Sequence, residues 1–192
     1  MKNKRYRVNE IFYSLQGEGY NTGRAAVFVR LSGCNLRCPF CDTDFSSYRE
    51  LTAQDIRTEV LRLAPSAPLV ILTGGEPTLQ ADEALVNELQ QAGYQVAMES
   101  NGTHEAPKNL NWLTVSPKCK PAVSRCNELK CLFDETGRVE DYGVEADHYY
   151  LQPCDVGDAE RNRAIVERCV EYIKQHPRWK LSLQMHKLIC IP

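Results

Sequence analysis

The chain has 192 residues, enough for one well-packed core and too few for two domains of ordinary size. Its 23 Lys and Arg balance 25 Asp and Glu without a basic stripe, so nothing indicates nucleic-acid binding and a small-molecule substrate is favoured. No apolar run is long enough to cross a membrane, and the basic residues 1–7 are not followed by the apolar segment of a signal peptide. Nine cysteines, an odd number, favour metal binding in a reducing compartment over disulfides. We expect a cytoplasmic protein of one domain.

The first predicted strand leads into a glycine-rich turn. Residues 5–14 are rich in β-formers and are followed by Leu15, Gln16, Gly17, Glu18 and Gly19. Glycines on both sides of a carboxylate indicate a tight turn or a close approach of the backbone to a ligand, with a plain hairpin turn as the alternative. Residues 25–31 form a second, apolar strand that contains Arg30, whose head group must find a partner if it is buried.

Three cysteines follow this strand at Cys-x3-Cys-x2-Cys spacing: Cys34, Cys38 and Cys41. Thiolates hold both zinc and iron–sulfur clusters, but structural zinc takes four protein ligands, whereas a 4Fe–4S cluster held by three cysteines keeps one iron open. The spacing therefore favours a 4Fe–4S cluster with a reactant on its fourth iron. A zinc site, or a chance spacing in a cysteine-rich chain, is the alternative.

Helices and strands then alternate to the end of the chain. Thr52 is a predicted N-cap, because Ile56, Val60 and Leu63 follow it at helical spacing. Two further helices are expected over residues 81–92, ending at Gly93, and over about 159–175. Short apolar runs predict strands over residues 69–72, 94–100, 112–115, 128–133 and 148–151.

Apolar strands interleaved with helices indicate parallel strands buried on both faces, and hence an α/β fold. A complete barrel needs about 250 residues. We therefore expect a partial TIM-type barrel of about six parallel strands with reduced helical cover, and a doubly wound open sheet is the alternative. Polar segments follow five strands, at Cys34 and at residues 73–76, 99–101, 116–118 and 152–155. Because parallel strands end at one rim, these segments should converge on one pocket.

The cysteine loop, with Phe40 just before its third cysteine, resembles the signature of the radical S-adenosylmethionine (SAM) superfamily. The resemblance implies a radical SAM core in which SAM chelates the fourth iron through its amino and carboxylate groups. It also implies that an electron from the reduced cluster cleaves SAM to a 5'-deoxyadenosyl radical. The cofactor carries that chemistry, and the protein supplies position and electrostatics.

An ordered set of motifs narrows the resemblance. Residues 15–19, Cys41-Asp42-Thr43, residues 73–77 (Thr-Gly-Gly-Glu-Pro), residues 116–118 (Ser-Pro-Lys), Gln152-Pro153 and residues 184–187 (Gln-Met-His-Lys) together resemble the 7-carboxy-7-deazaguanine synthase family. The match runs from about residue 8 to the C-terminus. It implies conversion of 6-carboxy-5,6,7,8-tetrahydropterin to 7-carboxy-7-deazaguanine with release of ammonia, by hydrogen-atom abstraction and Mg²⁺-assisted ring contraction. This is a step in making queuosine and other 7-deazapurines.

The same resemblance assigns the cofactor residues. SAM would contact Gly75, Ser116, Pro117, Lys118, Gln152, Pro153, Cys154 and Asp155. Thr43 would be a Mg²⁺ ligand, which is chemically reasonable because Mg²⁺ takes oxygen ligands and few protein groups. From the residues alone, Lys118 could equally be a solvated lysine and Thr43 a cap in a loop.

The pterin would contact Leu15, Gln16, Gly17, Glu18, Arg30, Thr73, His186 and Pro192. Glu18 and Gln16 suit the donors and acceptors of its aminopyrimidinone edge, and Arg30 suits its carboxylate, with a structural ion pair as the alternative. For Pro192 the alternative is a frayed chain end. The expected division is a substrate-binding segment over residues 5–24, a barrel core over 25–175 and a capping segment over 176–192.

Several interpretations remain open. Cys119, Cys126 and Cys131 could hold an auxiliary cluster, but buried or incidental thiols are favoured. A glycyl-radical activating enzyme shares the cysteine spacing, and a non-catalytic iron–sulfur sensor is the alternative from another class. Some relatives carry insertions between the first two cluster cysteines that this chain lacks. The resemblance suggests a homodimer and an electron donor such as flavodoxin or ferredoxin, and the sequence confirms neither.

Overall fold

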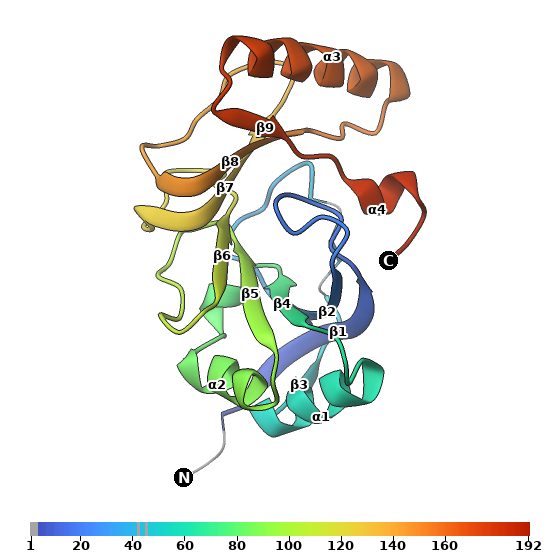
Figure 1. Cartoon of the computed structure of the whole chain (residues 1–192), viewed down its shortest axis with the longest axis vertical. Coiled ribbons are helices and arrows are strands. Elements are labelled where there is room, and N and C mark those ends of the chain that lie inside the picture. The colour runs from blue at the N-terminus through green and yellow to red at the C-terminus, as the bar shows by residue number, and fades with distance from the viewer. Residues whose placement is uncertain (1–3, 42, 45) are drawn as a thin grey trace.

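One sheet runs through the computed structural model, which describes residues 4–41, 43–44 and 46–192. Asp42 of the cysteine loop therefore lies outside the described residues. The sheet has the order β3-β1-β2-β4-β5-β6-β7-β8-β9 (Figure 1). Its strands are β1 (Tyr6–Leu15), β2 (Ala25–Leu31), β3 (Arg49–Leu51), β4 (Leu69–Gly74), β5 (Gln95–Ser100), β6 (Trp112–Val115), β7 (Arg125–Phe133), β8 (Glu145–Pro153) and β9 (Trp179–Leu181).

The pairing confirms the expected fold class. All pairings from β2 through β4, β5, β6, β7 and β8 to β9 are parallel, and only β1 runs antiparallel, against β2 and β3. The six predicted parallel strands are present. The short strand β9 was not predicted, because three residues with a central Lys180 give no strand signal.

Within the described residues, α1, α2 and α3 all cover the same face of this sheet, so the doubly wound alternative is wrong. Helices α1 (Ala53–Leu63) and α2 (Glu83–Gln91) pack on β1, β2, β4 and β5 around one apolar cluster, and α3 (Ala159–Gln175) packs on β7, β8 and β9 around a second. Because residues paired in register share a face, both clusters lie on the outer face of an open, partial barrel. Figure 1 shows α1 and α2 at one end of the molecule and α3 at the other.

Local sequence signals position the helix ends. Thr52 and Asp55 form a reciprocal capping box at the start of α1, as the predicted N-cap requires. Helix α2 begins two residues later than predicted, because a 3-10 turn, η1 (Pro77–Leu79), precedes it and Asp82 caps it. The last helix, α4 (Met185–Leu188), is a single turn near the C-terminus.

The inner face of the barrel changes from apolar to polar along its axis. Ala26, Leu69, Ile71 and Ala97 form a small apolar floor near the N-terminal ends of the strands. Side chains two positions further along a strand point to the same face. They include Thr73 in β4 and Glu99 in β5, so the polar half lies toward the C-terminal rim.

The β1–β2 turn, residues 16–24, fills the gap that the open sheet leaves. It starts at the N-terminal end of the parallel strands, since Leu15 pairs with Ala25. The Gly19 N–H donates to Ser182 Oγ at 3.0 Å, and the Met185 N–H donates to the Gly17 carbonyl oxygen at 3.0 Å. The turn therefore connects the β1 side of the opening to the segment that follows β9.

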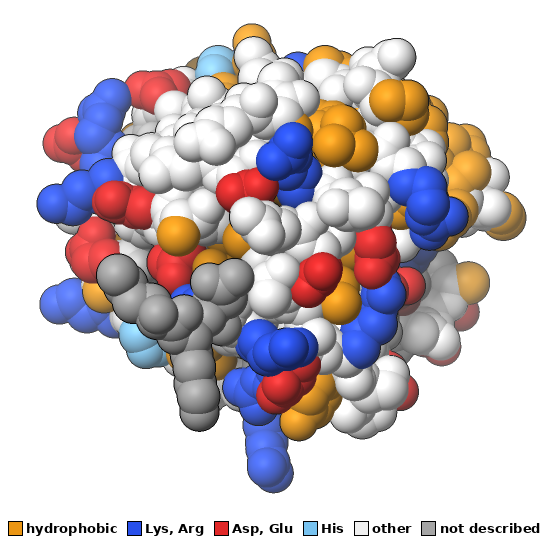
Figure 2. Space-filling view, turned by 90° about the horizontal axis from the view of Figure 1, so that it is seen from below, with side chains coloured by type: hydrophobic (Ala, Val, Ile, Leu, Met, Phe, Trp, Pro, Cys, Tyr) orange, Lys and Arg blue, Asp and Glu red, His pale blue; other side chains and the backbone are white. Residues whose placement is uncertain are grey.

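The surface carries mixed charge. On the face shown in Figure 2, Lys and Arg side chains are interspersed with Asp and Glu, and neither sign forms a continuous patch. This agrees with the balanced composition. None of the helices in the described ranges is both long and apolar enough to span a bilayer.

We predict that Thr52→Ala lowers the free energy of unfolding by about 1 kcal/mol, because the Asp55 N–H at the start of α1 loses its capping partner, the Thr52 hydroxyl. Thr58→Ala on the same helix is the matched control, since Thr58 is exposed and its hydroxyl only donates to the Gln54 carbonyl oxygen. We expect the control to change stability by less than about 0.5 kcal/mol. Urea unfolding followed by circular dichroism measures both, and equal losses would contradict the capping role.

Candidate active site

Two adjoining cavities open at the C-terminal rim of the barrel. The first has a volume of about 280 Å³ and the second about 500 Å³. They share part of their walls, formed by Glu18, Thr43, Thr73, Glu99, Gln184 and Lys187. A group bound in one cavity therefore lies next to a group bound in the other.

The first cavity collects the predicted cluster residues. Cys34, Cys38 and Cys41 all border it, on the loop that follows β2. Burial raises the pKa of the Cys38 thiol, although the nearby Lys118 opposes the shift. Elsewhere in the described chain, Cys126 and Cys131 are buried in the apolar cluster that packs around α3, here called the α3-side core. Burial raises the pKa of each of these two thiols to about 12. Cys119 is exposed. The thiols of Cys126 and Cys131 therefore stay protonated at neutral pH, which favours incidental thiols over an auxiliary cluster.

Glycines bring the end of β4 into contact with the cysteine loop. The Gly75 N–H donates to the Leu31 carbonyl oxygen, and the Glu76 N–H donates to the Gly33 carbonyl oxygen at 2.8 Å. A Cβ atom on Gly75 would lie 2.1 Å from the Gly33 oxygen and 2.9 Å from Cys34 Cβ. Only a residue without a side chain permits this approach, which seats the loop that carries the first cysteine.

The carboxylate of Glu76 is structural. It is fully buried, and it accepts hydrogen bonds from Ser100 Oγ at 2.8 Å and from the Asn101 N–H at 2.7 Å. It also accepts from the N–H and hydroxyl of Thr78. Glu76 therefore ties the C-terminal ends of β4 and β5 together beneath the first cavity.

Most residues predicted to contact SAM line the same cavity. They are Gly75, Ser116, Lys118, Gln152, Pro153, Cys154 and Asp155. Pro117 is buried and lines neither cavity. Lys118 is not a solvated lysine: its Nζ donates to Ser116 Oγ at 2.6 Å, and burial lowers its pKa.

The second cavity collects the residues predicted to contact the pterin. Leu15, Gln16, Gly17, Glu18, Arg30, Thr73, His186 and Pro192 all line it, and Thr43 lies on the shared wall. Ser14 Oγ donates to the Pro192 carbonyl oxygen at 2.8 Å, which fixes the last described residue against β1. Sequence positions nearly the whole length of the chain apart thus meet at one cavity.

Arg30 forms the ion pair that was the alternative to its predicted role, and among the described residues this pair uses only one of its three nitrogens. Its Nε lies 2.7 Å from Glu10 Oε1, and the Glu10 side chain is 51% exposed. Below the pair, the rings of Phe12 and Phe28 stack at 4.9 Å. Since only Nε contacts Glu10 among the described residues, the terminal nitrogens of Arg30 can face an anionic ligand in the cavity.

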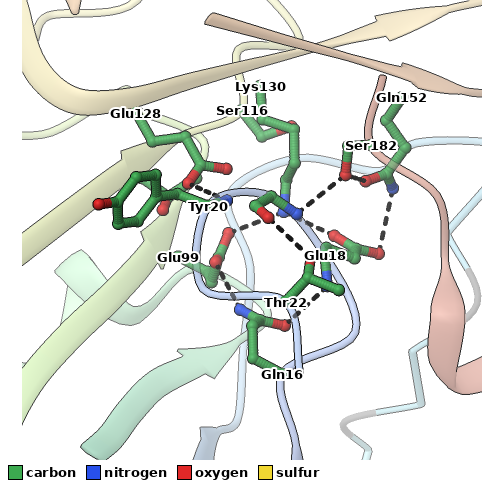
Figure 3. Close-up of polar contacts among 12 residues, drawn as sticks. Gln16, Glu18, Tyr20, Thr22, Glu99, Ser116, Glu128, Lys130, Gln152 and Ser182 are labelled. Carbon is green, nitrogen blue, oxygen red and sulfur yellow. Dashed lines mark hydrogen bonds and ion pairs between the residues drawn. The ribbon is translucent and has the colours of Figure 1, made fainter. Parts of the chain in front are cut away.

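Polar side chains inside the barrel form one connected network (Figure 3). Glu18 accepts from Lys130 Nζ at 2.6 Å through one oxygen, and from Gln152 and Gln184 at 3.1 Å through the other. Glu99 accepts from the same Lys130 Nζ at 3.0 Å and from Gln16 at 3.1 Å. Glu18 and Gln16 are therefore held in fixed orientations at the cavity wall.

Sequence reasoning did not identify Lys130 or Glu128 as residues of the site, whereas Glu99 lies in a strand-end segment expected at the pocket and Gln184 in a family motif. Glu128 and Lys130 alternate with apolar residues in β7, and that alternation was the available signal for an inner face that is polar. Burial raises the pKa of Glu128 to about 7, and its Oε1 has no hydrogen-bond partner among the described atoms. Its other oxygen accepts from the Tyr20 N–H at 3.0 Å.

The donor set fits the predicted cofactors. Among the described residues, no three His, Cys, Asp or Glu side chains are placed to hold a single metal ion. Three thiols instead border a cavity that also has a bare glycine backbone at Gly75 and an ammonium group at Lys118. Thiolates suit iron, and an open backbone suits the amino acid portion of a ligand.

Comparisons with known proteins agree with this geometry. The family model of the Radical SAM superfamily matches residues 28–116. The chain is 46% identical over 187 residues to the 7-carboxy-7-deazaguanine synthase of Bacteroides thetaiotaomicron, covering 96% of this chain and 98% of the relative. It is 39% identical over 211 aligned positions to the protein of that name from Caulobacter vibrioides. The crystal structure of QueE from Escherichia coli matches with a TM-score of 0.77 at 28% identity, covering 95% of each chain.

We predict that Gly75→Ala retains less than about half of the iron that the wild type retains after anaerobic reconstitution, because the added methyl displaces the cysteine loop. Gly93→Ala is the control. Its φ of +93° makes alanine cost about 1–2 kcal/mol, but a methyl there meets nothing within 4 Å. Iron content and visible absorbance measure the difference, and equal iron in both variants would contradict the seating role of Gly75.

Proposed function

The chain belongs to the 7-carboxy-7-deazaguanine synthase family of radical SAM enzymes, and from this we propose that the first cavity holds the 4Fe–4S cluster with SAM and the second holds the pterin. The shared wall is the observation that carries the proposal, because hydrogen-atom transfer requires the two bound groups to be adjacent. Because the chain belongs to this family, we set aside the two alternatives, a glycyl-radical activating enzyme and a non-catalytic iron–sulfur module.

The proposed substrate is 6-carboxy-5,6,7,8-tetrahydropterin, and the products are 7-carboxy-7-deazaguanine and ammonia. The cluster and SAM, when bound, supply a 5'-deoxyadenosyl radical for hydrogen-atom abstraction. Residues of this chain then act by holding the reactants: Cys34, Cys38 and Cys41 would hold the cluster, and Gly75, Ser116 and Lys118 would hold SAM. Gln152, Pro153, Cys154 and Asp155 complete the proposed SAM wall, and Pro117 would support it from behind.

Residues of the second cavity suit the pterin. The ionised carboxylate of Glu18 accepts hydrogen bonds, so it suits the donor edge of an aminopyrimidinone ring, with Gln16, the backbone of Leu15 and Gly17, and His186 beside it. The free fork of Arg30 suits the pterin carboxylate, and Thr73 and Pro192 complete the wall. Thr43, on the shared wall, is the proposed Mg²⁺ ligand, and Mg²⁺ would also bind the substrate carboxylate.

The three expected segments each contribute to this site. In this proposal, residues 5–24 provide the turn that contacts the pterin, and residues 25–175 provide the barrel and the cofactor cavity. Residues 176–192 cap the second cavity. We also propose that the enzyme works in the cytoplasm as a homodimer, with flavodoxin or ferredoxin as the electron donor. The thiols support a reducing compartment, since all nine cysteines are free.

The function is tested by mixing the anaerobically reconstituted protein with SAM, a reductant, Mg²⁺ and the tetrahydropterin. We expect 7-carboxy-7-deazaguanine to form without net consumption of SAM, and Cys34→Ala, Cys38→Ala or Cys41→Ala to abolish turnover. Cys169→Ala, in the α3-side core, is the matched control and should keep the activity. Product formation by the three site variants, or none by the wild type, would contradict the proposal.

Thr43→Ala tests the proposed Mg²⁺ ligand separately. We expect this variant to keep the iron content and SAM binding of the wild type, because the thiols are intact, and to lose the stimulation of turnover by Mg²⁺. Thr58→Ala is the control, because the exposed Thr58 hydroxyl on α1 donates to the Gln54 carbonyl oxygen and Thr58 lines neither cavity. Titrating Mg²⁺ against the turnover rate distinguishes them, and an unchanged response in Thr43→Ala would remove Thr43 from the site.

A further inference from the structure

We propose that Lys130 is a positioning residue that fixes Glu18 and Glu99 at the boundary of the two cavities and keeps Glu18 ionised for the pterin. The inference rests on the proposed function and assigns the origin of its substrate specificity to a residue inside strand β7. Lys130 acts through the two glutamates, since its Nζ is within hydrogen-bond distance of both.

Geometry gives Lys130 this role. Its side chain is only 5% exposed, and its Nζ lies 2.6 Å from Glu18 Oε2 and 3.0 Å from Glu99 Oε2. Glu18 comes from the β1–β2 turn and Glu99 from β5, so one ammonium group joins three parts of the chain (Figure 3). Both carboxylates line both cavities. The position of Lys130 therefore fixes two side chains of the shared wall.

The remaining oxygen of Glu18 is held as firmly. Its Oε1 accepts from Gln152 and Gln184, each at 3.1 Å. Three donors from β7, β8 and the segment after β9 thus converge on one carboxylate. Such a carboxylate cannot rotate freely, and Oε2, which accepts only from Lys130 among the described residues, presents its remaining lone pair to a ligand donor in a fixed direction.

The charges of the buried groups explain why the partner of Glu18 on β7 must be a cation. Burial alone would raise the pKa of Glu18, but Lys130 lowers it below its ordinary value, helped by Gln184 and His186. Burial alone would lower the pKa of Lys130, but Glu18, Glu99 and Glu128 together raise it. Lys118 is a further cation that faces this group. Lys130 therefore stays protonated and Glu18 stays ionised across the neutral range.

A protonated Glu18 would present a donor where the pterin edge also presents donors. Removing the charge of Lys130 leaves Glu18 buried beside Glu99 and Glu128, and both effects raise the pKa of Glu18. The loss of pterin affinity should therefore depend on pH. A lysine that only contributed to folding would change the affinity equally at all pH values.

The experiment compares Lys130→Met with the wild type, using reconstituted protein with SAM and the oxidised analogue 6-carboxypterin. Isothermal titration calorimetry gives the dissociation constant from pH 5.5 to 8. The readout at each pH is the dissociation constant of Lys130→Met divided by that of the wild type. This ratio cancels the titration of the ligand and the contribution of His186, which both proteins share. We expect this ratio to be about tenfold larger at pH 5.5 than at pH 8, which corresponds to a pKa shift of Glu18 into this range.

Three further variants sharpen the test. Lys130→Arg keeps the charge, so its ratio to the wild type should not vary with pH. Lys174→Met removes an exposed ammonium that is also 2.6 Å from a glutamate, Glu171, and its ratio should stay near one. Lys130→Gln keeps a donor and removes only the charge, so it gives the same readout as Lys130→Met if the latter does not fold.

The outcomes separate the two proposals. A wild type that binds no 6-carboxypterin overturns the proposed function and this inference with it. A wild type that binds the analogue, with a ratio for Lys130→Met or Lys130→Gln that is constant across pH, overturns only the role of Lys130. A ratio that rises toward low pH in these variants, and not in Lys130→Arg or Lys174→Met, supports it.

Discussion

The sheet of this protein does not close into a complete barrel, and the β1–β2 turn fills the opening that it leaves. The turn runs close against its surroundings: a Cβ atom on Gly19 would lie 1.9 Å from Glu128 Oε1, and one on Gly17 would lie 2.5 Å from His186 Nδ1. Gly19 also has a φ of +65°, which favours glycine. The two glycines around Glu18 therefore serve the packing of the chain against itself, and that packing aims the carboxylate between them.

Filling the barrel with a polar turn requires buried charge to be paired. The ammonium group of Lys130 stands among Glu18, Glu99 and Glu128. Glu18 and Glu99 contact it directly, whereas Glu128 does not and has a pKa raised to about 7 by burial. Because an ionised carboxylate without a partner is costly in such a place, the third glutamate relieves the excess of negative charge by taking up a proton near neutral pH.

Structural features that depend on residues close in sequence could be predicted, and features that depend on the position of the β1–β2 turn could not. The capping box at Thr52, the apolar strands and the cysteine spacing depend on neighbouring residues, so the fold class and the cofactor wall follow from them. The polar segments predicted after the strands supply most residues of the C-terminal rim, because parallel strands end on the same side of the sheet. Lys130 lies within a strand instead, and it gains Glu18 as a partner because Glu18 arrives on a turn from the opposite end of the barrel. Neither the local motifs nor their order along the sequence contains that contact.

The shared wall makes the two binding sites interdependent. Arg30 lines only the second cavity and Ser116 only the first, so each can act on one ligand alone. Glu18 and Glu99 line both, and the same Lys130 fixes both. A ligand that displaces either glutamate changes the field of the other through this ammonium group. Under the proposed assignment, occupancy of the second cavity would thereby be linked through Lys130 to the position of groups in the first, and this link would not require the strands to move.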